Sequence, residues 1–158
     1  MTRVAMRPPP PLTAAEIGAF AADWYRKLDE HAATADLLPM LSDHALAFHL
    51  PEAVLRSRDE FRDWYEGGSR FPGVINLFFD EIHTLTSVDV VAPGDPTRVR
   101  VAVNWQARRW RAPRPRSEWI GFDADQQWEV TRSPDTGAPV ITRYVVNSLR
   151  TMAGSPAL

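Results

Sequence analysis

The stretch from residue 98 to 130 constrains the fold more than any other part of this 158-residue chain. Residues 99–107 read VRVAVNWQA, and this alternation of apolar with polar or small side chains predicts a strand with one buried face. The prolines at 113 and 115 have no N–H to donate, so the strand ends there in a turn. Residues 119–130 return as WIGFDADQQWEV, mostly apolar at even positions and rich in carboxylates at odd ones. We therefore expect a long antiparallel hairpin with its even returning positions toward a core.

Two helix starts are marked by capping boxes, in which a hydroxyl and a carboxylate three residues apart satisfy the first free N–H groups. Thr13 with Glu16 predicts the first helix, and Ser57 with Glu60 predicts another that ends at Gly67. The first helix carries an apolar stripe at three- and four-residue spacing, made of Ile17, Phe20, Ala21, Trp24, Tyr25 and Leu28.

The remaining segments predict short elements first and long strands later. Residues 34–41 favour a short helix, residues 45–55 a short hairpin, and residues 74–90 and 140–149 two further long strands. Helices segregated from antiparallel strands indicate an α+β protein. We expect a curved antiparallel sheet that forms a cone closed by three N-terminal helices, a cystatin-like α+β barrel.

The length of the chain predicts a single domain with its own core. We place this domain at residues 13–150. A proline-rich flexible arm is expected at residues 1–12, and a flexible tail at residues 151–158.

Composition argues against several classes of function. The net charge of −2 gives no basic field for nucleic acid or an anionic membrane, and no apolar run is long enough to span one. The absence of cysteine removes thiolate ligands and thiol nucleophiles. No histidine pair has the spacing of a shared metal ion, and no glycine-rich phosphate loop is present. The sequence thus predicts no metal and no cofactor. The first residues lack the apolar core of a signal peptide, so we expect a cytoplasmic location.

The order of elements and four local patterns resemble the nuclear-transport-factor-2-like superfamily, particularly its polyketide-cyclase and ketosteroid-isomerase branch. The patterns are WYRKLD at 24–29, DLLPMLSD at 36–43, SRDEFRDWY at 57–65 and VAVNW at 101–105. The resemblance covers residues 13–150. It implies an apolar pocket inside the cone where a few polar groups transfer protons without a cofactor. It also implies a homodimer through the open face of the sheet.

The candidate catalytic residues are His49 and Asp80. His49 lies in the segment where isomerases of this fold carry an aspartate before a proline, and Asp80 shares strand parity with apolar neighbours. A carboxyl or imidazole in a dry cavity can act as acid or base near neutrality. A structural role for both residues remains the alternative. For Asp29 and His83 the structural role is the preferred interpretation.

The aromatic residues are the better candidates for a pocket, because a buried indole N–H needs a partner. The substrate-binding candidates are Trp24, Tyr25, Trp64, Asn104, Trp105, Phe122, Trp128 and Tyr144. Tyr25 and Asn104 are the expected orienting donors, and the alternative is that the aromatic residues only fill the core. We predict proton-transfer chemistry (isomerisation, dehydration or cyclisation) on a small hydrophobic carbonyl compound. The alternative is a non-catalytic ligand-binding or accessory protein of the same fold.

Overall fold

The computed structural model describes residues 7–158, so the first half of the expected arm, residues 1–6, lies outside the described residues. Within this range the helices are α1 (Ala14–Asp29), α2 (Thr34–Leu37), a 3₁₀ helix (Leu38–Met40), α3 (Arg58–Glu66) and α4 (Val74–Leu77). The strands are β1 (Ala47–His49), β2 (Val54–Leu55), β3 (Phe78–Ala92), β4 (Thr97–Arg109), β5 (Glu118–Arg132) and β6 (Pro139–Thr151).

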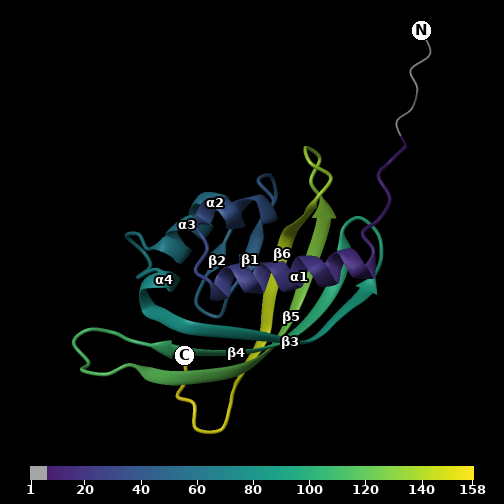
Figure 1. The fold of residues 1–158 in the computed structure, drawn as a ribbon. Helices are drawn as coiled ribbons and strands as arrows, with labels where there is room; N and C mark the ends of the chain where they lie inside the picture. The colour runs from purple at the N-terminus through teal and green to yellow at the C-terminus, as the bar shows by residue number, and fades with distance from the viewer. Residues whose placement is uncertain (1–6) are drawn as a thin grey trace.

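The strands form one six-stranded sheet in the order β2-β1-β6-β5-β4-β3. In Figure 1 the sheet bends around α1, and the shorter helices gather beyond the end of α1 near β1 and β2. The α+β class is confirmed, but three details of the expected fold are corrected. The sheet is mixed, because β1 runs parallel to β6. It is not closed into a barrel, since β1 and β2 have only three and two residues and do not reach β3. Four α-helices, rather than three, accompany the sheet in the described residues.

The expected hairpin is confirmed as β4 and β5. Their register runs without a shift from Thr97 opposite Val130 to Arg109 opposite Glu118. The even positions of β5 from 120 to 130 are buried, as the alternation predicts. Both helix starts are also confirmed: Thr13 and Glu16 form the complete capping box of α1, and the Ser57 hydroxyl caps α3.

The expected strand at residues 74–90 begins later and reverses its faces. Residues 74–77 form α4, because Gly73 at φ 92° turns the chain before the short apolar run. Asp80 has φ 50° and sits in a β-bulge, where the register with β4 shifts between Phe79 and Ile82. One extra residue moves the side chains that follow to the other face, until the next register shift between Leu85 and Ser87. Asp80 is therefore exposed, and the buried carboxylate is Glu81.

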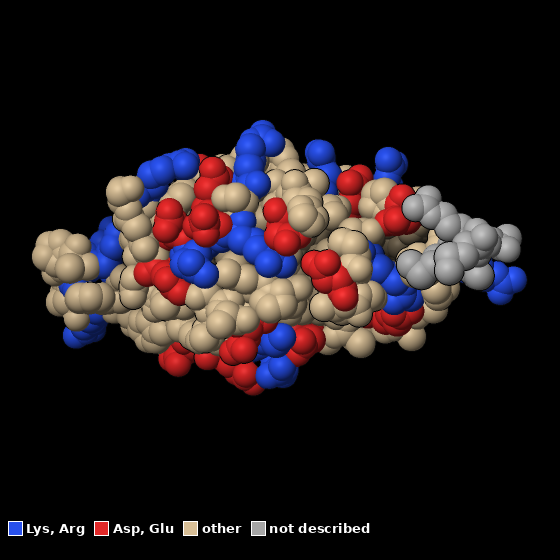
Figure 2. All heavy atoms as spheres, turned by 90° about the horizontal axis from the view of Figure 1, so that it is seen from above, with Lys and Arg blue, Asp and Glu red and all other residues tan. Residues whose placement is uncertain are grey.

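Both ends of the described chain contact the domain. Arg132 donates to the carbonyl of Pro10 at 2.7 Å, and Leu12 is buried. At the other end, the Met152 N–H donates to the carbonyl of Gly121 at 2.9 Å. No helix in residues 7–158 is long and apolar enough to cross a membrane. Figure 2 shows acidic and basic side chains interspersed over the face seen from above, without a large field of one sign.

Candidate active site

A cavity of about 500 Å³ lies between α1, α3, α4 and the concave face of the sheet. Its wall is mostly apolar and aromatic, and its lining includes Trp24, Phe48, Trp64, Leu77, Val103 and Leu149. Few polar groups interrupt this wall, and they include Glu81, His83, Gln126 and Tyr144. An apolar cavity with a few convergent polar groups is the usual form of a small-molecule site.

Asp29, at the end of α1, holds His83 on β3. Asp29 Oδ1 lies 2.5 Å from His83 Nδ1, and Asp29 Oδ2 accepts the backbone N–H of His83 at 2.9 Å. A carboxylate only accepts hydrogen bonds, so in the neutral imidazole Nδ1 carries the hydrogen and Nε2 keeps its lone pair. A carboxylate partner of this kind fixes both the tautomer and the orientation of an imidazole. The arrangement suits His83 to accept a proton at Nε2.

The imidazole of His83 is held between two aromatic rings. Tyr25 stacks on it with ring centroids 4.6 Å apart, and Trp105 lies nearly parallel to it at 5.9 Å. Nε2 makes no hydrogen bond within residues 7–158. Among the described side chains, Trp24 Nε1 is the one buried nitrogen or oxygen without a hydrogen-bond partner. His83 Nε2 also has no partner but does not belong to this class, so it is open to solvent. His83 therefore offers a free nitrogen while lining the cavity.

Glu81 places a second ionisable group in the cavity wall, two residues before His83. Its Oε1 accepts the indole N–H of Trp105 at 3.2 Å, and its Oε2 lies 2.8 Å from His31 Nε2. Burial raises the pKa of Glu81 above its ordinary value, and the imidazoles of His83 and His31 only partly oppose this effect. Glu81 is thus suited to hold a proton at a higher pH than an exposed glutamate.

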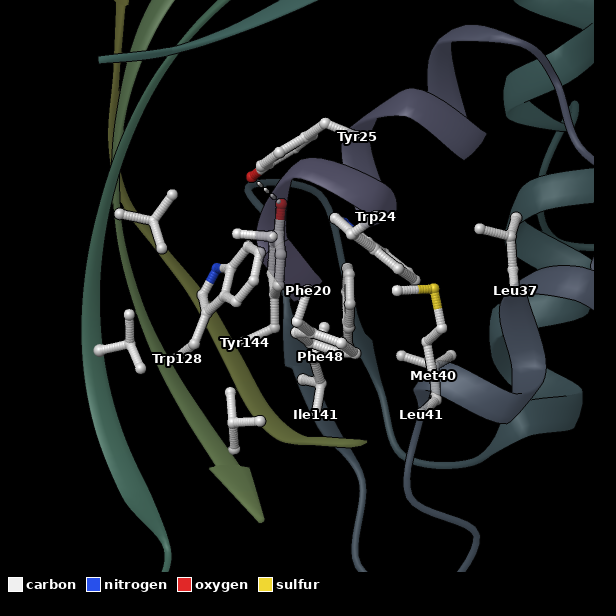
Figure 3. Packing of buried hydrophobic residues seen from close by; sticks show 14 of the residues in the cluster. Phe20, Trp24, Tyr25, Leu37, Met40, Leu41, Phe48, Trp128, Ile141 and Tyr144 are labelled. Atoms are coloured by element: carbon white, nitrogen blue, oxygen red, sulfur yellow. Dashed lines mark hydrogen bonds between the residues drawn. The ribbon is translucent and has the colours of Figure 1, made fainter. Parts of the chain in front are cut away.

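A buried hydrogen-bond network joins α1 to β5 and β6. The Tyr25 hydroxyl donates to Gln126 Oε1 at 2.8 Å and lies 3.1 Å from the Tyr144 hydroxyl, as the dashed line in Figure 3 shows. Trp128 Nε1 donates to the same Gln126 oxygen at 2.9 Å. Burial raises the pKa of Tyr144 to about 12 and that of Tyr25 well above its ordinary value. Both hydroxyls therefore keep their protons at neutral pH.

Four of the eight substrate-binding candidates line the cavity: Trp24, Trp64, Trp105 and Tyr144. The other four do not. Tyr25 lies behind the cavity wall and supports His83 and Gln126. Phe122 and Trp128 are core residues. Asn104 belongs to the outer face of the sheet, where its amide donates to Asp123 at 2.9 Å.

The structure does not bring His49 and Asp80 together. Phe48 and Leu50, the neighbours of His49 in the sequence, line the cavity, but His49 itself does not. Asp80 is exposed at the bulge. The polar groups that do share the cavity wall include Glu52, Arg109, Arg111 and Tyr144, together with Glu81, His83 and Gln126.

Sequence reasoning did not select these three residues, although two signals were present. Gln126 is a polar residue on the otherwise apolar face of β5, and His83 shares its parity with Glu81 and Leu85. The pairing of Asp29 with His83 had no local signal, because 54 positions separate the two residues.

No group of three or more His, Asp or Glu side chains in residues 7–158 is arranged to hold a metal ion.

No protein-family model matches the sequence, and no match is found among curated proteins. Solved structures do match. A proposed aromatic ring hydroxylase from Novosphingobium aromaticivorans superposes with a TM-score of 0.71 at 15% identity, over 88% of this chain and 92% of that one. A nuclear transport factor 2-like superfamily protein from Salmonella enterica gives 0.62 at 13%, over 89% and 93%. The chain has the nuclear transport factor 2-like fold.

Other proteins with this fold carry names that bear on function. A proposed scytalone dehydratase from N. aromaticivorans matches with a TM-score of 0.61 at 17% identity, over 91% of this chain and 87% of that one. A ketosteroid isomerase-like protein, a hexachlorocyclohexane dehydrochlorinase and the β subunit of a benzoate 1,2-dioxygenase match at TM-scores of 0.64, 0.61 and 0.60. At these identities the nuclear transport factor 2-like fold is what the proteins share.

Proposed function

We propose that this protein is a cofactor-independent enzyme that removes a proton from carbon in a small hydrophobic carbonyl compound. The observation that carries the proposal is the pairing of Asp29 with His83 beside the apolar cavity. A base whose lone pair is free and whose opposite nitrogen is held by a carboxylate is prepared for general base catalysis.

The reaction would begin with transfer of a proton from the carbon next to the carbonyl to His83 Nε2. Asp29 would stabilise the resulting imidazolium, while the electron pair of the broken C–H bond delocalises onto the carbonyl oxygen as an enolate. Return of the same proton to another carbon of the conjugated system would give isomerisation. Loss of a β-hydroxyl group as water would instead give dehydration, with Glu81 supplying the proton that the leaving oxygen needs.

The names of three structural neighbours support this class of reaction, namely a proposed scytalone dehydratase, a dehydrochlorinase and a ketosteroid isomerase-like protein. Each name denotes an elimination or an isomerisation, and both reactions can start with removal of a proton from carbon. These names support the proposed reaction by analogy of fold. The roles proposed for Asp29, His83 and Glu81 are argued from the contacts of this chain.

The test is exchange of carbon-bound protons in D₂O, followed by NMR over a panel of hydrophobic ketones and enones. We expect enzyme-dependent exchange at the carbon next to the carbonyl. His83→Asn keeps a side-chain N–H near the position of Nδ1 but removes Nε2, and should slow exchange by about 10²- to 10⁴-fold. His44→Asn is the matched control, because His44 is an exposed histidine paired only with Asp43. Equal rates in the two variants would overturn the proposal.

A second candidate is a non-catalytic ligand-binding or accessory protein. The match to a dioxygenase β subunit favours it, as does the predominantly apolar wall of the cavity. It predicts that hydrophobic ketones bind in the cavity without any exchange of their protons, in the wild-type protein and the His83→Asn variant alike.

A further inference from the structure

Gln126 is a buried polar residue in an apolar wall. Its side chain is on the concave face of β5 between Ala124 and Trp128, the residue is only 4% exposed, and it lines the cavity. An amide in such a place costs free energy unless its polar atoms find partners. The hydrogen-bond partners of its oxygen and its nitrogen therefore indicate the role of the residue.

The oxygen of Gln126 is fully used, and its identity is fixed by chemistry. Oε1 accepts the Trp128 indole N–H at 2.9 Å and the Tyr25 hydroxyl at 2.8 Å. An indole nitrogen can only donate, so the amide atom that faces Trp128 must be the oxygen. Nε2 with its two hydrogens must then point the other way.

The nitrogen of Gln126 has no hydrogen-bond acceptor in residues 7–158, because neither of the hydrogen bonds of this side chain involves Nε2. The amide lies close enough to the Tyr144 hydroxyl to lower its pKa. The two groups nevertheless make no hydrogen bond of normal geometry. In the described chain, Trp24 Nε1 is the one buried side-chain nitrogen or oxygen without a hydrogen-bond partner. Gln126 Nε2, which also lacks a partner, is therefore not fully buried. Gln126 Nε2 is thus an open donor at the cavity surface.

We propose that Gln126 Nε2 binds the carbonyl oxygen of the substrate and holds the negative charge that develops there. This inference rests on the proposed function for its catalytic half, whereas the binding half stands on the geometry alone. Two donors to Oε1 polarise the amide and strengthen Nε2 as a donor. Gln126 is neutral, and Glu81 lines the same cavity. The two arginines of the lining, Arg109 and Arg111, lie at and beyond the end of β4, whereas Gln126 pairs with Val101 near its start. The surroundings of Gln126 therefore suit an uncharged carbonyl better than a carboxylate.

Tyr25 connects this donor to the proposed base. Its ring stacks on His83 at 4.6 Å, and its hydroxyl donates to Gln126. One residue of α1 therefore fixes the orientation of both groups in the same cavity wall. A donor already oriented toward the developing charge needs no rearrangement during the reaction, which is the condition under which such hydrogen bonds accelerate reactions most.

The test compares two planar ligands of the same shape, 2-acetylnaphthalene and 2-isopropenylnaphthalene, in which CH₂ replaces the carbonyl oxygen. Binding is measured by calorimetry, and the carbonyl stretch of the bound ketone by infrared spectroscopy. We expect the preference for the ketone over the hydrocarbon to fall about tenfold in Gln126→Met, since a neutral hydrogen bond is lost. The carbonyl stretch should be at lower frequency on the wild-type protein than on the variant.

Gln127→Met is the matched control, because Gln127 is the neighbouring glutamine and is exposed on the outer face of β5. A second measurement avoids any effect of substitution on folding. In the ¹⁵N-labelled wild-type protein, the side-chain amide signals of Gln126 should shift on binding the ketone and shift much less on binding the hydrocarbon. Equal ketone preference in both methionine variants, or wild-type protein that binds neither ligand, would overturn the inference.

The outcome is distinguishable from failure of the proposed function. His83→Asn should remove proton exchange while its ketone preference stays above that of Gln126→Met. A ketone preference that depends on Gln126, without exchange that depends on His83, would remove the catalytic role and retain the binding site.

Discussion

Asp29 and His83 are 54 positions apart in the sequence, yet the side-chain atoms Oδ1 and Nδ1 lie 2.5 Å apart. The second oxygen of Asp29 accepts the backbone N–H of His83 at 2.9 Å, so one carboxylate holds both the ring and the strand. The contact joins the end of α1 to β3. It gives the cavity an imidazole whose Nδ1 faces a carboxylate.

Replacing Asp29 tests the partnership without removing the base. In Asp29→Asn the new amide can donate to Nδ1 and favour the tautomer with hydrogen on Nε2, so the nitrogen facing the substrate loses its lone pair. We expect proton exchange to slow by about 10²-fold or more, toward the loss seen on removing a general base. NMR exchange rates measure this change.

The control for this substitution is Asp135→Asn, because Asp135 is exposed in the turn between β5 and β6. Its exchange rate should equal that of the wild-type protein. An Asp29→Asn variant as fast as the control would show that the contact is structural only.

The raised pKa of Glu81 predicts a definite dependence of stability on pH. A carboxyl whose pKa is higher in the folded than in the unfolded state stabilises the fold below the unfolded value, about 4.5, and this contribution is lost as the pH rises through the folded value. Glu81→Gln cannot titrate. The free energy of unfolding of the wild-type protein minus that of the variant should therefore fall with rising pH.

The size of this fall is about 1.4 kcal/mol for each unit by which the pKa is raised. His31 and His83 face Glu81, and both lower its pKa against the larger effect of burial. Urea unfolding at a series of pH values gives the difference. If the difference in unfolding free energy between the wild-type protein and Glu81→Gln stays constant or grows with pH, then burial does not raise the pKa of Glu81.

Phe48 supports the cavity from the side of β1. Its ring stacks on Tyr144 with centroids 4.0 Å apart and meets Phe61 edge-on at 5.6 Å, and the residue is buried. Phe48→Ala should lower the free energy of unfolding by about 3–5 kcal/mol, because it removes buried contacts and leaves a void. Thermal or urea unfolding measures the loss.

Phe79→Ala is the comparison, since Phe79 is 38% exposed. It should cost about 1 kcal/mol or less. Similar losses for the two variants would contradict the assignment of Phe48 to the core.

The predicted homodimer through the sheet can be tested on the outer face. That face carries cross-strand polar pairs, among them Arg100 with Asp125 at 2.9 Å. We propose that two copies pair there, so light scattering after size exclusion should give twice the mass of the 158-residue chain. Arg100→Asp places like charges side by side and should shift the mass to that of a monomer.

Arg62→Asp is the control for charge, because Arg62 is exposed on α3, away from the outer face of the sheet. It should leave the dimer intact. A wild-type mass equal to one chain would remove the dimer from the account.

Much of the fold could be predicted because its signals are local. The alternation in β4 and β5 and the helix caps at Thr13 and Ser57 each lie within a few residues of what they specify. The faces of β3 could not be predicted this way. Three register shifts with β4, the first at Asp80, change which side chains of β3 face the core, and the local sequence does not mark where they fall.

The candidate site was predictable only in part, for the same reason. Trp24, Trp64 and Trp105 were expected in the pocket because large aromatic residues on inward faces have few other places to go. The roles of Asp29 and His83 depend on how α1 lies across the sheet. That arrangement is set by packing of the whole domain rather than by either residue's neighbours.

The proposed role of His83 as a base depends on its tautomer, which long-range ¹H–¹⁵N NMR of the imidazole can determine. The spectrum should be recorded at a pH about two units above the ordinary imidazole pKa of about 6.5, so that the ring is neutral. We predict hydrogen on Nδ1 and none on Nε2 in the wild-type protein, with this preference lost in Asp29→Asn. Hydrogen on Nε2 in the wild-type protein would leave the cavity without a base at His83 and would contradict the account.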